Sequence, residues 1–574
     1  MKNTLSQLRS YKKQLILGPL CKLIEAVLEL TMPLIMARMI DNRAQGMSLI
    51  IRYSLIMLAV AAVGLGFALV CQYYASRASQ GFGTKLRAAL MQKISSLSPA
   101  QVQSFGASSL TNRLTSDVNQ LQTAVAMMIR LASRAPFLCI GASIMAMSID
   151  LPLSVILIVL IPLFILVLYL ILSRSLPLFT KLQGGLDRLA LLVGENLSGV
   201  RVIRAFNNAP RQRESFTKSN GELYSTYTLA GRLSALMNPA TALIMNGAIC
   251  AVLWFGGFSV KDGRLTTGEV IAYINYLTQI MLQMIIVSNL MVLFSKAYAG
   301  GKRVEAVLQT QPDICSPAKP EPIGKNKNAP AIEFENVSFA YRAGANALEG
   351  INFALQGGEA LGIIGGTGSG KSTLLSLVDR LYDASEGTVK IWGTDVRRCD
   401  LTQLRSQMAI VEQEPSLLSG SIRSNLQYGN SAASDTELIE ALKLAQAWEF
   451  VEKLPKGLDS SIERGGRNLS GGQRQRLAIA RAIAAKRPIL MLDDASSALD
   501  YATDSKLKAA LNTLDCTTVI VAQRVKSVYS AQSIVCLENG RIAGMGTHEE
   551  LFDTCREYRE ICDSQGVGRG GKLV

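Results

Sequence analysis

The sequence predicts a membrane-embedded all-α domain followed by an α/β domain built on a parallel sheet. The 574-residue chain is 49% hydrophobic and only 18% charged, with a mean hydropathy of +0.24, whereas soluble domains carry about 25% charged residues. Near-continuous apolar stretches fill the N-terminal half, and short β-like runs alternate with helical stretches in the C-terminal half. The modest glycine and proline contents and the 10 scattered cysteines exclude collagen, a disordered chain and a disulfide scaffold.

The N-terminal half contains six apolar stretches, each close to the ~20 residues that a helix needs to cross the hydrocarbon layer. We expect a six-helix transmembrane domain with spans at about 16–40, 49–73, 124–148, 151–173, 235–259 and 269–296. Lys22, Glu25 and Glu29 in the first span either face the bundle interior or water, or show that the span begins later. The connections 74–123 and 174–234 are amphipathic, so we expect them to be long cytoplasmic extensions of the membrane helices.

The distribution of charge orients this domain. Residues 1–320 hold 30 basic and 13 acidic residues, whereas the rest of the chain holds 29 and 31. The whole positive excess therefore lies in the apolar half, which indicates basic cytoplasmic loops and argues against a nucleic-acid partner. The connection 174–234 carries nine basic residues and the connection 148–151 none. We therefore predict a multi-pass protein of the cell membrane, embedded in lipid, with its N-terminus and C-terminal half in the cytoplasm and no removable signal peptide.

A change of composition separates the two halves. Residues 310–330 contain five prolines and no periodic apolar pattern, which is typical of an exposed linker. We predict a transmembrane domain at 1–310, a linker at 311–330 and an α/β domain at 331–574.

The most specific motif is the glycine-rich segment GGTGSGKS, which follows the apolar run ALGII and precedes the helical run TLLSLVDRLY. Glycines let backbone N–H groups close around a phosphate at a helix N-terminus, the lysine supplies positive charge to the β- and γ-phosphates, and the serine offers a hydroxyl to Mg²⁺. This P-loop predicts a nucleotide-binding domain. Its binding residues are expected to be Gly365, Gly366, Thr367, Gly368, Ser369, Gly370, Lys371, Ser372 and Thr373.

Two further motifs can be interpreted because the chain also contains a P-loop. The apolar run ILML ends at Asp493, and an acid at the carboxyl end of a buried strand near a phosphate loop can hold Mg²⁺. On its own this residue would be an acid at the start of a loop. The segment LSGGQ precedes the run RQRLAIARAI, and on its own it would be a glycine-rich turn before an amphipathic helix.

Together these motifs make the chain resemble the ATP-binding cassette (ABC) transporters over essentially its full length. The apolar half resembles the six-helix exporter type through NRLTSDVNQL (112–121) and GENLSGVRVIRAFNN (194–208). The resemblance implies that the nucleotide is ATP, that Tyr341 stacks on adenine, and that Gln413 contacts Mg²⁺ and senses the membrane domain. Magnesium would thus be held by Ser372, Gln413 and Asp493. Short helices near 98–107 and 205–213 would contact the cassettes.

The resemblance also implies that one chain cannot complete an ATP site. In the family, the LSGGQ helix points its N-terminus at a γ-phosphate held by the other subunit. The residues of this chain that would serve a second half-transporter are Ser470, Gly471, Gly472 and Gln473, together with Asp500 in the loop SALD that crosses the dimer interface.

The chain departs from the family at two catalytic positions. Asp494 replaces the usual glutamate that polarises the attacking water, and its carboxylate is set back by about one carbon–carbon bond, roughly 1.5 Å. Gln523 replaces the histidine beside the γ-phosphate, and an amide can neither become cationic nor carry a proton. His548, the single histidine of the chain, lies well after this position, and we expect it to be structural.

These departures predict one half of a heterodimeric ABC exporter. This chain would hold ATP in a degenerate site that hydrolyses slowly, and its intact LSGGQ would complete a competent site on a partner carrying glutamate and histidine. Two alternatives stay open: a homodimer with two slow sites, and a sensor or regulator that couples nucleotide occupancy to conformation without pumping. The direction of transport rests on the exporter resemblance, because some proteins with this membrane fold import.

The sequence constrains the substrate weakly, to amphipathic compounds, lipids or peptides. Arg130 and Arg134 could face an anionic substrate or anchor the third span at the inner headgroups. Polar residues in the last span could line a cavity or form interhelical hydrogen bonds. They are Tyr273, Asn275, Tyr276, Gln279, Gln283 and Asn289.

Overall fold

The computed structural model describes residues 2–324, 329–341, 344, 346–497 and 499–570. Residues 325–328 of the predicted linker and Ala498 of the predicted interface loop lie outside the described part. The chain forms two compact units, of which one comprises Met1–Ser95 with Phe105–Thr310 and the other Ser96–Ser104 with Gln311–Val574. Each unit is described by itself.

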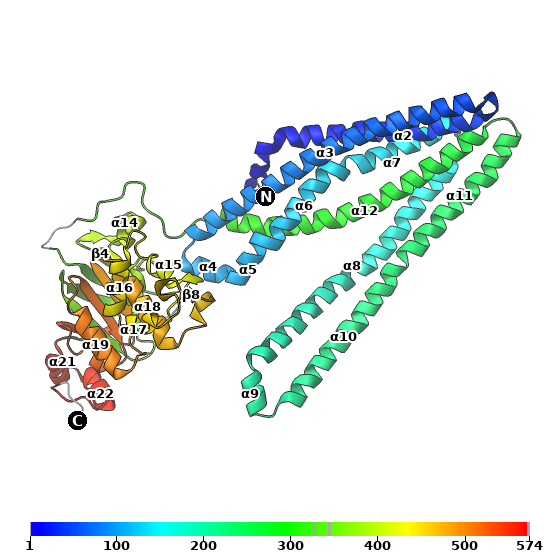
Figure 1. Ribbon diagram of the computed structural model, residues 1–574. Coiled ribbons are helices and arrows are strands. Elements are labelled where there is room, and N and C mark those ends of the chain that lie inside the picture. Colours follow the sequence, from blue (N-terminus) through cyan, green and yellow to red (C-terminus); the bar gives the residue numbers. More distant parts are fainter. Residues whose placement is uncertain (1, 325–328, 342–343, 345, 498, 571–574) are drawn as a thin grey trace. The chain divides into compact units, whose positions relative to one another are not determined.

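The first unit is entirely helical (Figure 1). Its helices are α1 (Lys2–Ser6), η1 (Gln7–Tyr11), α2 (Lys12–Asp41), η2 (Arg43–Gln45), α3 (Met47–Ser96), α5 (Ala107–Asn112), η3 (Arg113–Asp117), α6 (Val118–Met127), η4 (Met128–Ala132), α7 (Arg134–Ile149), α8 (Val155–Ser198), α9 (Val200–Ala205), α10 (Ala209–Ala235), α11 (Met237–Lys261) and α12 (Thr267–Gln309). The intervening helix α4 (Pro99–Phe105) belongs mostly to the second unit. The turns η3 and η4 are π-helical.

Within the described residues, five helical segments are long and apolar enough to cross a membrane, and these are Met47–Ser96, Ala107–Ile149, Val155–Ser198, Ala209–Lys261 and Thr267–Gln309. Helix α2, which contains the first predicted span, is not one of the five. Its apolar run is interrupted by Lys22, Glu25 and Glu29, so the six-span count stays a prediction.

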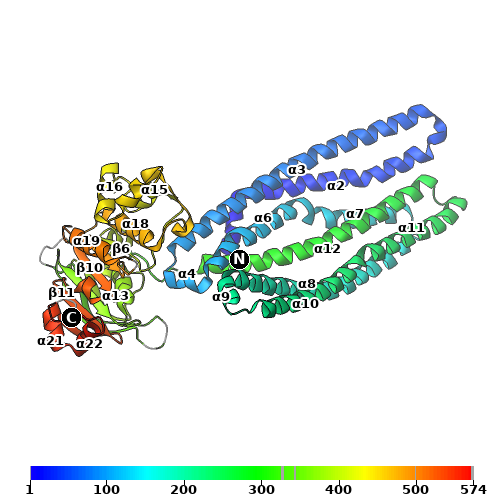
Figure 2. The same ribbon diagram turned by 60° about the horizontal axis from the view of Figure 1, so that its bottom comes forward.

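The long connections are helical, as predicted. Helix α3 continues without a break from the membrane stretch to Ser96, and α8 and α10 form a long hairpin (Figures 1 and 2). The short helix at the tip of this hairpin is α9, which ends at Ala205, so the helix exists but lies earlier in the chain than the predicted range 205–213. The chain turns earlier because Gly199 leaves the helical conformation after α8 and Asn207 adopts a positive φ of 49° before α10.

Polar side chains tie helices of the first unit together. The buried Tyr276 hydroxyl donates to the Leu30 carbonyl at 2.6 Å, which joins α12 to α2. The buried Glu305 carboxylate near the end of α12 accepts hydrogen bonds from the Asn3 and Thr4 backbone N–H groups at 3.0 and 2.8 Å, so it caps the N-terminal helix α1. Tyr276 therefore serves interhelical bonding, one of the two roles considered for the polar residues of the last span.

The second unit is an α/β domain with three sheets. The strands are β1 (Ile332–Phe339), β2 (Leu348–Leu355), β3 (Ala360–Gly365), β4 (Glu386–Ile391), β5 (Thr394–Asp395), β6 (Met408–Val411), β7 (Gly420–Ser421), β8 (Ser461–Ile462), β9 (Ile489–Asp493), β10 (Thr517–Ala522), β11 (Ser533–Glu538) and β12 (Arg541–Gly546). The sheet orders are β2-β1-β4-β5, β12-β11-β3-β10-β9-β6 and β7-β8. Strands β11, β3, β10, β9 and β6 are parallel, and β12 adds an antiparallel edge.

Helices surround the six-stranded sheet (Figure 2). They are α13 (Lys371–Val378), η5 (Val396–Arg398), α14 (Leu401–Arg405), α15 (Ile422–Leu426), α16 (Asp435–Leu444), α17 (Trp448–Glu452), η6 (Gly457–Asp459), η7 (Arg464–Gly466), α18 (Gly471–Ala484), α19 (Tyr501–Leu511), α20 (Val525–Val528), α21 (His548–Thr554) and α22 (Arg556–Ser564). The predicted alternation of strands and helices is therefore confirmed.

The second unit also includes residues 96–104. Gln101 of α4 donates from Nε2 to the Gln311 carbonyl at 2.8 Å and to Asp313 Oδ1 at 2.7 Å. The short helix after α3 is thus fastened to the segment that begins the second unit.

Asp379, directly after α13, is the basis of a stability prediction. The pKa of its carboxyl is raised to about 6, mainly by burial; Arg405 opposes the shift, and the nearby Glu412 adds to it. The folded protein binds this proton more tightly than the unfolded chain, so the ionised form costs stability above pH 6 and the cost disappears as the pH falls toward 4. Asp379→Asn should therefore stabilise the second unit at pH 7.5 by about 1–3 kcal/mol and have little effect near pH 4.5.

Differential scanning calorimetry of the full-length protein at both pH values checks this expectation. The exposed Asp515→Asn is the control and should shift the transition equally little at each pH. A destabilised Asp379→Asn protein at pH 7.5 would contradict the assigned cost.

Candidate functional site

The P-loop connects β3 to α13 and has the conformation that its glycines permit. Gly368 and Gly370 adopt φ values of +82° and +101°, which side chains other than glycine rarely accept. A Cβ at Gly370 would lie 2.7 Å from the Ala347 carbonyl oxygen. The Lys371 ammonium donates to the carbonyls of Gly365 and Gly366 at 2.9 and 2.6 Å, so the loop folds around the lysine that starts α13.

The carboxyl ends of three strands meet beside this loop. Strand β10 pairs in parallel with β3 and β9, with Ala522 opposite Ile364 and Val521 opposite Asp493. The residues that follow these strands therefore share one edge of the sheet. They include the P-loop after β3, Asp494 after β9 and Gln523 after β10.

A cavity of about 310 Å³ lies at this edge. It brings together eleven of the predicted cofactor, metal and catalytic residues, which approach from five separate segments of the chain. Its lining consists of Tyr341, Ala347, Thr367, Gly368, Gly370, Lys371, Ser372, Thr373, Gln413, Asp493, Asp494, Val521 and Gln523. The neighbouring Gly366 and Ser369 line an adjoining cavity of about 390 Å³, together with Gly368.

The oxygen groups in the cavity fit a hard divalent cation. Ser372 and the buried Asp493 line the same cavity; burial raises the pKa of Asp493, and the nearby Ser372 hydroxyl partly opposes this shift. Within the described residues there is no group of three His, Cys, Asp or Glu side chains that could hold a metal alone. The pair fits Mg²⁺, which is usually bound by one or two protein oxygens together with substrate phosphates and water.

Burial also lowers the pKa of Lys371, although the negative charges of Asp494 and Asp493 oppose the shift. Three charges, one positive and two negative, thus share a poorly hydrated space. A triphosphate entering beside Lys371 would add negative charge, so a divalent cation next to Asp493 would be needed to balance it.

Asp494 and Gln523 lie side by side in the cavity. Gln523 Nε2 donates to Asp494 Oδ2 at 3.4 Å, and the Asp494 backbone N–H donates to the Val521 carbonyl at 2.9 Å. Burial and the neighbouring Asp493 raise the pKa of Asp494. Asp494 has a positive φ of 46°, a conformation that aspartate tolerates better than most residues. The two residues that differ from the family pattern, Asp494 and Gln523, therefore contact each other.

Tyr341 and Gln413 lie at the same cavity. The Tyr341 hydroxyl forms a hydrogen bond with the Thr373 hydroxyl at 2.9 Å, and its ring stands edge-on to Phe339 and Tyr382. The side chain is 53% exposed, so its outer face is accessible to a planar ligand. Stacking on adenine and contact of Gln413 with Mg²⁺ stay predictions.

The signature residues do not line this cavity. Ser470 is the N-cap of α18: its hydroxyl accepts from the Gln473 backbone N–H at 3.2 Å, and Gln473 Oε1 accepts from the Ser470 N–H at 2.9 Å. This capping box fixes the start of α18, whose first residues are Gly471 and Gly472. Asp500 likewise caps α19 by accepting from the Thr503 N–H at 3.2 Å.

His548 is structural, as predicted. It is buried, its Nδ1 lies 2.8 Å from the Tyr558 hydroxyl, and its Nε2 lies 3.3 Å from the Gly568 carbonyl. Because a carbonyl can only accept, Nε2 carries the proton when the ring is neutral. The histidine therefore fastens the C-terminal segment to α21.

Gln565 contacts the loop after β10 and was missed by sequence reasoning. Its Nε2 donates to the Gln523 carbonyl at 2.8 Å, and its Oε1 accepts from the Val525 N–H at 2.9 Å. A single amide thus holds the backbone on both sides of Arg524. A residue 42 positions after Gln523 carries no motif that could have indicated this contact.

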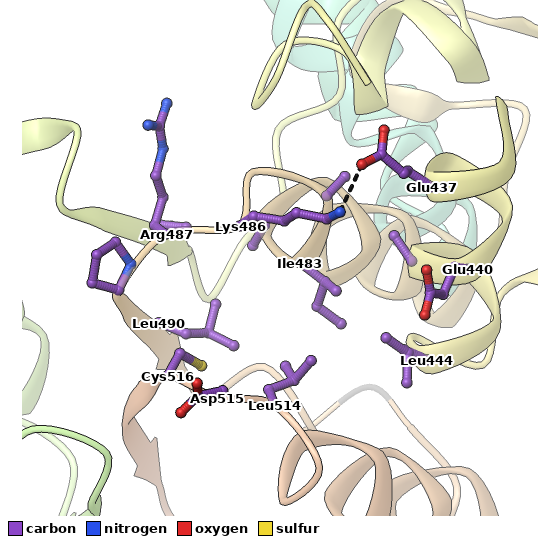
Figure 3. Close-up of a pocket in the computed structure, with 15 residues that line it drawn as sticks. Glu437, Glu440, Leu444, Ile483, Lys486, Arg487, Leu490, Leu514, Asp515 and Cys516 are labelled. Carbon is purple, nitrogen blue, oxygen red and sulfur yellow. Dashed lines mark hydrogen bonds and ion pairs between the residues drawn. The ribbon is translucent and has the colours of Figure 1, made fainter. Parts of the chain in front are cut away.

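A separate cavity of about 440 Å³ lies between α16, α18 and the segment before β10 (Figure 3). Lys486 reaches across one side of it and donates to Glu437 Oε1 at 2.7 Å. Its apolar part includes Leu444, Ile483 and Leu514. None of the predicted nucleotide-binding residues lines it, so it is distinct from the cavity at the P-loop.

Comparisons with known proteins agree with this arrangement of helical unit, P-loop and signature helix. Residues 15–284 match the family described as ABC transporter transmembrane region, and residues 348–497 match the family described as ABC transporter. The protein named "Uncharacterized ABC transporter ATP-binding protein YfiB" of Bacillus subtilis (strain 168) is 35% identical over 574 residues, which cover 100% of this chain and 99% of the relative. This chain belongs to the ABC transporter family.

Two other proteins place the chain within the ABC family. The ATP-dependent lipid A-core flippase of Desulfotalea psychrophila (strain LSv54 / DSM 12343) is 35% identical over 390 residues, 68% of each chain. A solved structure of a bacterial Atm1-family ABC exporter with ATP bound superposes with a TM-score of 0.81 at 22% identity and covers 97% of this chain and 99% of that one, which shows a shared fold. The chain is thus a multi-pass ABC transporter with an exporter fold and an ATP-hydrolysing domain.

The contact of Gln565 with the loop after β10 can be tested by hydrogen exchange. In Gln565→Ala, the Val525 N–H loses its acceptor, and we expect its exchange to accelerate about fivefold or more, since a lost hydrogen bond costs about 1 kcal/mol or more. Gln565→Glu keeps the acceptor and should preserve most of the protection. Exchange mass spectrometry of the full-length ABC protein measures both, and equal acceleration in the two variants would contradict the assigned role.

Proposed function

We propose that this chain is one half of a heterodimeric ATP-driven exporter and contains its degenerate ATP site. The contact between Asp494 and Gln523 carries this proposal. In this contact, neither side chain can act as the family's usual catalytic pair: the aspartate carboxylate is set back, and the glutamine amide does not take up a proton. The P-loop, Asp493 and the signature segment keep the family's residues. We therefore expect the site to bind ATP although it hydrolyses ATP slowly.

The need for a second chain follows from the signature helix. Ser470 and Gly471 start α18, but neither lines the cavity around Lys371. Each signature helix would meet the phosphates bound by the other chain. This chain's LSGGQ would complete a competent site on the partner, and the partner's would cover ATP held at Lys371.

The long hairpin α8–α10 supports contact with a partner chain. Large apolar side chains are left exposed along it, including Leu197 at 73%, Phe206 at 80% and Tyr224 at 71%. Exposure of this kind on a helical surface outside the lipid is typical of an interface. Closure of two cytoplasmic cassettes around ATP would move α4 and α9 and switch the membrane cavity from inward- to outward-facing.

Within the site, each residue has a distinct task. Lys371 and the P-loop N–H groups would hold the β- and γ-phosphates, and Tyr341 would orient the base. Mg²⁺, bound by Ser372, Asp493 and Gln413, would neutralise phosphate charge. The Asp494 carboxylate would lie too far from the attacking water to activate it well. An amphipathic cargo is favoured by the similarity to a lipid A-core flippase.

The proposal is tested by restoring the family residues. In the assembled transporter whose partner has lost its catalytic glutamate, we expect Asp494→Glu with Gln523→His to raise ATP turnover at least tenfold, because general-base catalysis contributes about 10²–10⁴. Asp494→Glu alone should recover part of this. Asp515→Glu, on the protein surface, is the control.

Phosphate release by the purified complex is the readout. Brisk hydrolysis by wild-type chain purified without any partner, unchanged by the double substitution, would contradict the degenerate site. Transport by a complex of two identical chains would favour the homodimer instead.

A further inference from the structure

Charged side chains form a cluster between α2 and the segment η4–α7. Lys22 donates to Glu25 at 2.6 Å, and Arg134 contacts Glu29 Oε2 at 2.5 Å. The side chains are 16% exposed for Lys22, Glu25 and Arg134, and 33% for Glu29. Ionisable groups are costly in membrane helices, and those that persist there mark functional sites.

The charges in this cluster do not balance. Glu25 and Glu29 neutralise Lys22 and Arg134, whereas the half-buried Arg130 has no ion-pair partner among the described residues. The cluster therefore has a net charge of one positive unit. Polar atoms beside it are also unsatisfied, because neither Ser133 Oγ nor Arg134 Nε has a hydrogen-bond partner in the described structure, although both are buried.

The helix geometry brings these groups together. Residues Met128–Ala132 form the π-helical turn η4, and such turns are frequent at functional sites. A Cβ at Gly18 would lie 2.5 Å from Ile129 Cγ2, so α2 and η4 can only approach this closely at a glycine. Helix α2, which carries Lys22 and Glu25, packs against η4, which carries Arg130.

The depth of the cluster in the membrane indicates which part of a lipid it would contact. Helix α7 is 16 residues long, so in the proposed orientation Arg134 lies about 22 Å below its outer end at 1.5 Å per residue. Arg130 lies about one turn deeper, near the inner edge of a hydrocarbon layer about 30 Å thick. Headgroup phosphates of the inner leaflet lie at this level. Simple anchoring would leave the arginines exposed toward lipid, whereas Arg134 is largely enclosed by protein.

We propose that this cluster is a binding site for the anionic headgroup of an amphiphile, with Arg130 as the residue that supplies the unbalanced charge. The Ser133 hydroxyl and Arg134 Nε would donate hydrogen bonds to the same headgroup, and the apolar chains would lie along the adjacent helices. This inference deepens the proposed function and rests on it, because it names the class of cargo that the transporter would accept at its inner leaflet.

Native mass spectrometry of the purified full transporter tests the site without ATP, so its outcome does not depend on catalysis. The probe is dioctanoyl phosphatidic acid, compared with dioctanoyl phosphatidylcholine. We expect the wild type to retain phosphatidic acid preferentially, Arg130→Ala to lower its occupancy at least tenfold, and Arg130→Lys to keep an intermediate level. Arg52→Ala, an exposed arginine of α3, is the matched control and should bind as the wild type does.

Two further arms make the outcome decisive. Inorganic phosphate that displaces the lipid would assign the site to a free anion, and failure to displace it would assign the site to a lipid headgroup. ATP binding at the P-loop checks that each variant is folded. Equal retention by wild type and Arg130→Ala, or equal losses in Arg130→Ala and Arg52→Ala, would overturn the proposal.

Discussion

The parallel register of β3, β10 and β9 is the constraint on which the ATP site depends. Because Ala522 pairs with Ile364 and Val521 with Asp493, the residues after these strands emerge at one edge of the sheet. The P-loop supplies positive charge and backbone donors there, and β9 supplies a buried carboxylate. A shift of register by one residue would turn each of these side chains to the opposite face.

The sequence predicted the parts of this site that follow local rules. A glycine-rich loop between a strand and a helix, and the start of a helix at Leu-Ser-Gly-Gly-Gln, are encoded over a few residues. Contacts between distant segments could not be predicted: Gln565 holds the loop after Gln523, and Glu305 caps the N-terminal helix. The first membrane span and the helix at the hairpin tip were less predictable. Half-buried ion pairs interrupt the span, and the positive φ of Asn207 sets the turn.

Both units hold charged side chains away from water. In the cassette, Lys371 is balanced by Asp493 and Asp494. In the helical unit, Arg134 is balanced by Glu29, whereas Arg130 has no such partner among the described residues. In the proposed function, the ATP site of this chain binds ATP more readily than it hydrolyses it, and the proposed headgroup site lets the membrane domain accept a negatively charged group.

The composition of that assembly tests the central claim most directly. The transporter should be purified through a tag on this chain from its native membranes and weighed intact by native mass spectrometry. We predict one copy of this 62.0 kDa chain together with one different ABC chain that carries glutamate and histidine at the positions of Asp494 and Gln523. A complex of twice the mass of this chain, made of two identical copies, would contradict the account.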